Sequence, residues 1–379
     1  MLWNTYAFRA YLLKHPGDES PMDSQQPYTS PEFATAQVPI SDDPPPDPPA
    51  SSVLRRTFFG QFGLRAGWGL LIYCLLIFAI QRFVNVIGHH IVASHQHAAA
   101  AAGNPVPPAP KPDPSQLQNV APLLAVEAVV AGVVLLLACL MSFIERRRFG
   151  VYGLGGQHSI KFFITGAFWG LLALSLLVLS LKSLHLLVFD ARVDHGLSIF
   201  GWGFTLLLGF LLVGIFEENF FRGYLQFTLT RGFVGLGNLT SAKHSRAIAF
   251  WIAAVLTSAL FLVAHTSNAG ETKIGLISVF LAGLVFVVAM WRTGSLWWAI
   301  GFHMAWDWAQ SFLYGVPDSG GLIQGRLFAT HPLGNPTLSG GTVGPEGSVL
   351  IIPVLILVII VLLLTKRSPQ PPLEQLLRH

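Results

Sequence analysis

Long apolar runs alternate with short polar segments along most of this chain. A helix needs about 20 apolar residues to cross the hydrocarbon core of a bilayer. Eight runs approach that length, at residues 62–86, 120–144, 160–184, 197–216, 247–264, 274–291, 296–314 and 349–364. Because lipid offers the backbone no hydrogen-bond partner, such spans should be helices. The pattern therefore predicts an all-α fold, a polytopic transmembrane bundle of about eight helices.

The two ends of the chain differ from its middle. Residues 1–52 are polar and Pro-rich, ending in SDDPPPDPPASS, and such a segment cannot bury enough apolar surface to offset its ordering entropy. We expect a disordered Pro-rich cytoplasmic tail there. Residues 53–199 should form N-terminal transmembrane helices, and residues 313–379 a Gly-rich loop, the last transmembrane helix and a short basic tail. Residues 200–312 lie between them and carry the most unusual polar groups.

The composition favours lipid as the surrounding solvent. Hydrophobic residues make up 52% and charged residues 11% of the chain, whereas a soluble domain carries about 25% charged residues. The net charge is +4, and the basic residues form short clusters between apolar runs, mostly on one side if both termini are cytoplasmic. These features argue against a nucleic-acid partner. They predict a multi-pass integral protein of a bacterial plasma membrane, with both termini in the cytoplasm.

Two adjacent glutamates follow the fourth apolar run, in GIFEENFFRGYLQF. A charge inside a span costs about 2.5–3.5 kcal/mol on insertion scales, so such residues are informative. Glu218 and Arg222 have i,i+4 spacing and can pair on one helical face, which leaves Glu217 without a local cation. Desolvation could then prepare Glu217 as a general base. The alternative is an ordinary helix end whose interfacial charges reach water. We interpret Glu127, near the start of the second run, as an interfacial residue of that kind.

Two further segments place histidines in apolar surroundings. His265 closes the apolar span in SALFLVAHTSN, one turn after Phe261. A single histidine at a span end is more typical of an interface than of a ligand. His303 and Asp307 have i,i+4 spacing in RTGSLWWAIGFHMAWDWAQ. That spacing suits an imidazole oriented by a carboxylate, either for hydrogen bonding or for metal ligation. A structural His–Asp pair within the bundle is the alternative.

Together these segments resemble the CPBP family of intramembrane proteases, which includes Rce1-like CAAX prenyl proteases, lysostaphin-resistance-protein-A-like proteins and Abi proteins. The family pattern is E-E-x-x-x-R, then F-x-x-x-H, then H-x-x-x-N/D, on separate helices. Here the first motif runs from Glu217 to Arg222, the second from Phe261 to His265, and the third from His303 to Asp307. The resemblance covers about residues 200–312, and it departs from many relatives in having Asp rather than Asn at position 307.

The resemblance implies an intramembrane endopeptidase acting on a membrane-associated peptide or protein, of CAAX type or of leader or bacteriocin type. Glu217 would activate water, and Glu218 would be its partner, held by Arg222. His265 and His303 would donate to the oxyanion or bind a metal, with Asp307 assisting.

The resemblance is compatible with both a metal-dependent and a metal-independent mechanism. A metal version would use Zn²⁺ or another divalent ion on Glu217, His265 and His303, and a metal-free version is equally compatible. A non-enzymatic membrane protein, either a proton-coupled transporter or a scaffold, is the alternative function, since buried charges also form ion relays.

Strict alternation of the eight spans creates a difficulty of depth. It places Glu217 at the cytoplasmic end of the fourth span but His265 at the outer end of the fifth. His303 falls about two turns inside the seventh span. Catalytic groups must approach one reacting atom, so either a span boundary is wrong or a helix is broken near the site.

Overall fold

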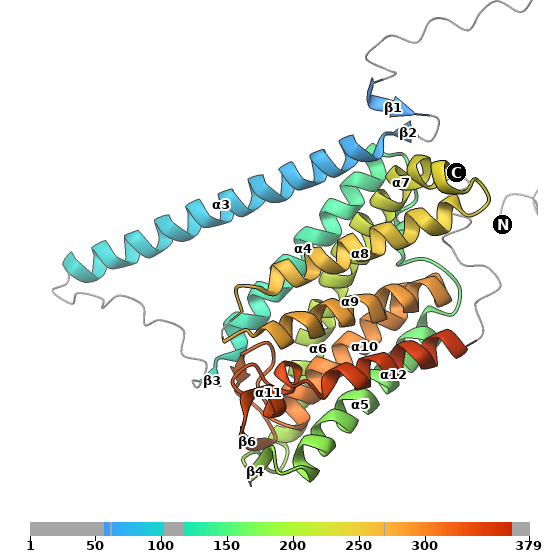
Figure 1. Ribbon diagram of the computed structural model, residues 1–379. Coiled ribbons are helices and arrows are strands. Elements are labelled where there is room, and N and C mark those ends of the chain that lie inside the picture. The colour runs from blue at the N-terminus through green and yellow to red at the C-terminus, as the bar shows by residue number, and fades with distance from the viewer. Residues whose placement is uncertain (1–56, 61–62, 102–116, 269, 366–379) are drawn as a thin grey trace, which may run out of the picture. The chain divides into compact units, whose positions relative to one another are not determined.

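The computed structural model describes residues 57–60, 63–101, 117–268 and 270–365. The predicted tail at residues 1–52 lies outside the described residues. Each of the eight predicted spans coincides with a helix (Figure 1). These helices are α3 (Ala66–Ala101), α4 (Val120–Ile144), α5 (Ser159–Ser183), α6 (Ser198–Glu218), α8 (Ser245–His265), α9 (Lys273–Thr293), α10 (Trp297–Trp308) and α12 (Ile351–Leu364). The all-α prediction is confirmed.

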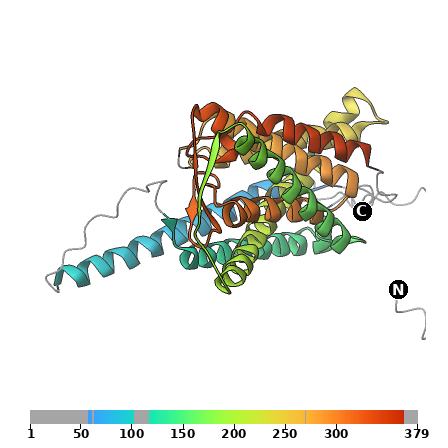
Figure 2. The ribbon, with the colours of Figure 1, turned by 90° about the horizontal axis from the view of Figure 1, so that it is seen from below.

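Five helical segments of the described chain are long and apolar enough to cross a membrane, namely Val120–Ile144, Ser159–Ser183, Ser198–Thr240, Ser245–His265 and Lys273–Thr293. Two shorter apolar helices, Ala66–Ile80 and Ile351–Leu364, accompany them. Figure 1 and Figure 2 both show the C-terminal half of α3 extending past the ends of the other helices. The first span therefore continues as a helix beyond its predicted end at residue 86.

The fourth span does not end where the sequence suggested. α6 passes without interruption into a π-helical segment, η2 (Asn219–Leu225), and then into α7 (Gln226–Thr240). The whole run, Ser198–Thr240, is a 43-residue helical segment, and Glu217 lies near its middle. The predicted boundary at residue 216 was wrong. It was placed there because charged residues such as the two glutamates usually mark a membrane interface. They are instead accommodated inside the bundle, so the helix has no need to end there.

Glycines allow α5 and α10 to pack closely. A Cβ atom built on Gly166 would lie 2.0 Å from the carbonyl oxygen of Trp298, and one on Gly170 would lie 2.2 Å from that of Phe302. Gly301 of α10 approaches α5 in the same way, at 2.2 Å from the carbonyl oxygen of Phe163. Small residues four apart are typical of close helix–helix contacts in membranes, where packing and hydrogen bonds rather than hydrophobicity drive association. This contact fixes the position of α10.

We expect Gly170→Val to lower the free energy of unfolding by about 1–3 kcal/mol, because the added methyl groups force α5 and α10 apart. Gly132→Val on α4 is the matched control, since no heavy atom lies within 4 Å of its Cβ position. Thermal unfolding of the purified variants in detergent measures the difference. Equal melting temperatures for the two variants would contradict the importance of this contact.

A polar network lies at the end of the bundle opposite to His265. The carboxylate of Glu145, at the end of α4, accepts hydrogen bonds from the Tyr224 hydroxyl at 3.0 Å and from Arg231 Nη1 at 2.6 Å. Arg147 Nε lies 3.3 Å from the same carboxylate, and Arg231 Nη2 donates to the Leu64 carbonyl at 2.8 Å. Two arginines, one after α4 and one in α7, thus meet the Glu145 carboxylate at this end.

Small strands and the Gly-rich segment lie at the other end. β3 (Leu117–Gln118) pairs in parallel with β5 (Leu322–Ile323), and β4 (Leu187–Arg192) pairs antiparallel with β6 (Phe328–Pro332). Near them lie the short helices α11 (Pro336–Ser339) and η4 (Pro345–Gly347). Figure 1 shows these elements beside the N-termini of α4 and α12. The remaining described elements are a strand pair, β1 (Phe59–Gly60) with β2 (Gly63–Leu64), a 3-10 turn, η1 (Phe149–Tyr152), and a π-helical segment, η3 (Ala309–Leu313).

Candidate active site

The glutamate motif lies at the junction of α6 and η2. Glu218 is fully buried, and its Oε1 accepts a hydrogen bond from Arg222 Nη1 at 3.1 Å. The predicted i,i+4 pair is therefore present. Glu217, 16% exposed at the side chain, points elsewhere and has an Oε2 with no hydrogen-bond partner among the described groups. π-helical turns often occur at functional sites, and here one follows directly after the two glutamates.

His303 connects the glutamates to α10. Its Nδ1 lies 3.2 Å from Glu218 Oε1. Its Nε2 lies 3.7 Å from Glu217 Oε2 and 3.4 Å from Asp307 Oδ2. Both ring nitrogens therefore face carboxylate oxygens, which accept hydrogen bonds when ionised. This arrangement suits a doubly protonated imidazole. A second π-helical segment, η3 (Ala309–Leu313), follows α10.

His265 is the last residue of α8 and is partly buried. Its Nδ1 lies 2.8 Å from the backbone carbonyl oxygen of Phe261. Because a carbonyl oxygen can only accept, Nδ1 carries a proton and donates it. Nε2 is the ring atom left for other chemistry. Phe261 and His265 of the second motif therefore contact each other within one turn. Their ring centroids are also 4.5 Å apart.

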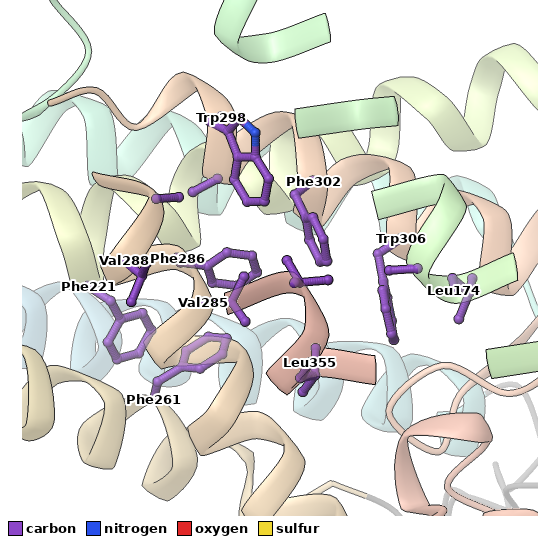
Figure 3. Packing of buried hydrophobic residues seen from close by; sticks show 14 of the residues in the cluster. Leu174, Phe221, Phe261, Val285, Phe286, Val288, Trp298, Phe302, Trp306 and Leu355 are labelled. Atoms are coloured by element: carbon purple, nitrogen blue, oxygen red, sulfur yellow. The ribbon is translucent and has the colours of Figure 1, made fainter. Parts of the chain in front are cut away.

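A cavity of about 440 Å³ brings the motifs together. Four of the six predicted site residues line it, namely Glu217, His265, His303 and Asp307. Glu218 and Arg222 are buried, at 0% and 1% exposure. Glu218 contacts His303, which lines the cavity, and Arg222 contacts Glu218. Apolar walls come from α4, α6, α8, α9, α10 and α12, including Leu124, Phe210, Phe261, Phe286, Phe302, Trp306 and Leu355. Figure 3 shows the rings of Phe286, Phe302 and Trp306 in this cluster.

This cavity resolves the difficulty of depth. Glu217 lies within a continuous helical run rather than at its end, and His303 lies in the interior of α10. The cavity extends from these two residues to His265 and on to Gln118 and Ser319. The three motifs therefore share one cavity without a broken span. The difficulty arose because the predicted end of the fourth helix was wrong.

Three carboxylates beyond the motifs also line the cavity: Glu127 of α4, and Asp318 and Glu346 of the Gly-rich segment. The interpretation of Glu127 as a simple interfacial residue omitted its place on this wall. Asp318 Oδ2 accepts from the Ser311 hydroxyl at 3.1 Å, and Glu346 accepts from the Trp306 indole at 3.3 Å. Asp318 and Glu346 lie in a loop without periodicity, so no signal in the sequence distinguished them.

The spacing of possible metal ligands differs from the set implied by the resemblance. Asp307, Asp318 and Glu346 have carboxylate oxygens within 4.8 Å of one another. In the described part of the chain, Glu217, His265 and His303 do not form a group with that spacing.

Burial raises the pKa of Asp318 well above its usual range, and the neighbouring charges of Asp307 and Glu346 raise it further. Burial also raises the pKa of Glu346. A carboxyl with a raised pKa binds its proton more tightly in the folded state. The Asp318 carboxyl therefore makes its full contribution to stability at pH values below its ordinary pKa, near 3.8. That contribution falls as the pH rises above this value.

We therefore expect Asp318→Asn to raise the melting temperature much more at about pH 8 than at about pH 4.5. The amide removes the buried charge and can still accept from Ser311. Thermal unfolding of both proteins in detergent across this pH range measures the effect. A difference of the same size at both pH values would show that this carboxyl does not titrate as described.

Comparison with family models gave a match over residues 199–309, to the family described as "Type II CAAX prenyl endopeptidase Rce1-like". Comparison with curated proteins and with solved structures gave no match. The apolar helices and this match together indicate an integral membrane protein. The resemblance carried by the three motifs is confirmed: the segment formed by residues 199–309 matches the Rce1-like family of CAAX prenyl endopeptidases.

Proposed function

We propose that this protein is an intramembrane endopeptidase in which Glu217 activates the attacking water. The observation that carries the proposal is the position of Glu217 Oε2. It has no hydrogen-bond partner among the described groups and lies 3.7 Å from His303 Nε2, and the Glu217 side chain lines a cavity shared with His265. A general base must have an acceptor atom available near the reacting water, and Glu217 meets that condition.

The other members of the cluster have distinct roles in this proposal. Glu218 is a positioning residue, because its Oε1 accepts from both Arg222 and His303. Arg222 neutralises Glu218 in a region without water access. Asp307 orients His303 from one turn away, at 3.4 Å from Nε2. The cluster holds Glu217 and His303 side by side, ready for a substrate.

The reaction follows from these positions. Glu217 takes a proton from water, and the water oxygen bonds to the carbonyl carbon of the scissile peptide. The carbonyl electron pair moves to its oxygen, and the resulting oxyanion accepts hydrogen bonds from protonated Nε2 of His265 and His303. Collapse re-forms the carbonyl and breaks the carbon–nitrogen bond. The leaving amine receives the proton that Glu217 holds, which restores the carboxylate.

The substrate we propose is a peptide segment attached to the membrane, of CAAX type or of leader or bacteriocin type. The cavity volume of about 440 Å³ falls within the range of ligand pockets, about 300–1,000 Å³. Its walls combine aromatic and aliphatic side chains with a few carboxylates and histidines. Such a site can accept an apolar side chain or lipid-modified residue while presenting the reacting bond to Glu217.

The test uses purified protein in lipid nanodiscs and two fluorogenic peptides, one farnesylated at a C-terminal CAAX cysteine and one carrying a leader-type apolar anchor. We expect cleavage of at least one peptide, and no loss of rate with a strong chelator such as 1,10-phenanthroline, because no step in this mechanism uses a metal. Loss of activity with the chelator, restored by added Zn²⁺, would contradict the metal-free mechanism. Failure to cleave either peptide would contradict the substrate class.

A further inference from the structure

Phe286 of α9 contacts two groups of the candidate site at once. It is 3% exposed. Its ring stacks on the His303 ring, with centroids 5.2 Å apart and planes at 20°. The guanidinium carbon of Arg222 lies 5.0 Å from the centre of the same ring. Because Arg222 and His303 both donate to Glu218 Oε1, one aromatic ring supports both donors of that carboxylate.

Arg222 depends strongly on aromatic neighbours. It is fully buried with one ion pair, and its Nε and Nη2 have no hydrogen-bond partner among the described groups. Its guanidinium carbon instead lies 4.2 Å from the ring centre of Phe261 and 5.6 Å from that of Phe221. Figure 3 shows Phe221, Phe261 and Phe286 gathered in one region. A desolvated cation over an aromatic face is stabilised by the ring quadrupole, so these rings replace missing acceptors.

The backbone of α9 comes close to the same cation. A Cβ atom built on Gly283 would lie 3.0 Å from Arg222 Nη2, one helical turn before Phe286. α9 therefore presents a glycine where the guanidinium passes and an aromatic ring where it must be supported. The imidazole of His303 can rotate about its terminal torsion, and the Phe286 face limits the planes that it can adopt.

We propose that Phe286 is a positioning residue that sets the plane of His303 and holds Arg222 against Glu218. This inference rests on the proposed function, in which His303 Nε2 must be directed at the oxyanion. Phe286 belongs to neither the glutamate nor the histidine motifs. Its side chain also borders the cavity, so a substrate contact is the rival role, and it predicts a different kinetic result.

The kinetic test compares Phe286→Leu, which removes the aromatic face, with Phe286→Tyr, which keeps it. The matched control is Phe250→Leu: Phe250 is equally buried, on α8, and packs against Trp251 and Trp291 rather than the site. We expect Phe286→Leu to lower kcat about tenfold, equivalent to about 1.4 kcal/mol, with KM nearly unchanged. Phe286→Tyr should recover most of kcat, and Phe250→Leu should retain wild-type kcat.

A second readout needs no catalysis. Diethyl pyrocarbonate modifies accessible, unprotonated imidazole nitrogens, and mass spectrometry gives the modified fraction of each histidine. Exposed His244, between α7 and α8, serves as the internal reference. We expect Phe286→Leu to raise His303 modification about threefold relative to His244, because a locally freed ring is more accessible and leaves the carboxylates that favour its second proton. Phe286→Tyr and Phe250→Leu should match the wild type.

The outcomes separate the two proposals. If the wild type cleaves no peptide, the proposed function fails, and His303 reactivity still decides the role of Phe286. Unchanged reactivity in Phe286→Leu overturns the positioning role, as does a rise in KM with constant kcat, which would assign Phe286 to substrate binding. Equal kinetic losses in Phe286→Leu and Phe250→Leu would show general loss of packing and would also overturn it.

Discussion

Glu217→Gln should reduce kcat for peptide hydrolysis by about 10²–10⁴-fold, the range expected when a positioned general base is lost. Glutamine has nearly the same shape as glutamate, so the cavity should keep its form. It cannot take a proton from water, however, and the amide cannot transfer one to the leaving amine. Initial rates with the cleaved peptide, normalised to folded protein, measure the effect.

The matched control is Glu127→Gln, since Glu127 lines the same cavity from α4 but makes no described contact with His303. This variant should keep kcat within a few-fold of the wild type. If Glu217→Gln also stays within a few-fold, Glu217 is not the base. If both variants lose activity equally, the cavity needs its total negative charge rather than one base.

Arg222→Met should destabilise the protein by about 3–5 kcal/mol, the usual effect of removing one partner of a buried ion pair. Methionine fills similar space and suits the surrounding phenylalanine rings. It leaves Glu218, at 0% exposure, without its cation, so the loss comes chiefly from an uncompensated buried charge. The free energy of unfolding in mixed detergent–denaturant titrations measures it.

The double variant Glu218→Gln with Arg222→Met removes both charges and should recover a large part of this stability. Activity should not return with it, because His303 loses an ionised acceptor at Nδ1. Arg222→Lys should also be inadequate, since a point charge cannot lie flat between aromatic faces as a guanidinium does. A double variant no more stable than Arg222→Met would contradict the pairing.

The sequence was sufficient for contacts within one helix. Glu218 with Arg222, and His303 with Asp307, were predicted from i,i+4 spacing, and both pairs are present. The spans were predicted from length and hydropathy, because bilayer thickness imposes a narrow range of helix lengths. The contact of His303 with Glu218 joins residues 85 positions apart. Spacing cannot predict it, and only the family resemblance placed the two together.

Features that depend on tertiary partners were missed. The fourth helix was ended at residue 216 because charges usually mark an interface, yet Arg222 and His303 compensate Glu218 within the bundle. Asp318 and Glu346 come from an irregular segment whose path the pattern does not specify. Phe286 is one of 28 phenylalanines, and nothing in its sequence surroundings distinguishes it. The predicted orientation, with both termini in the cytoplasm, stays a prediction.

The most direct test of the central claim is a single-turnover cleavage in water enriched in oxygen-18, with products identified by mass spectrometry. The account predicts that the wild type places one heavy oxygen in the new C-terminal carboxyl group during the first turnover, because water attacks the peptide carbonyl directly. Glu217→Gln should yield almost no product under the same conditions. Unlabelled product in the first turnover, or labelled product from Glu217→Gln at the wild-type rate, would contradict the account.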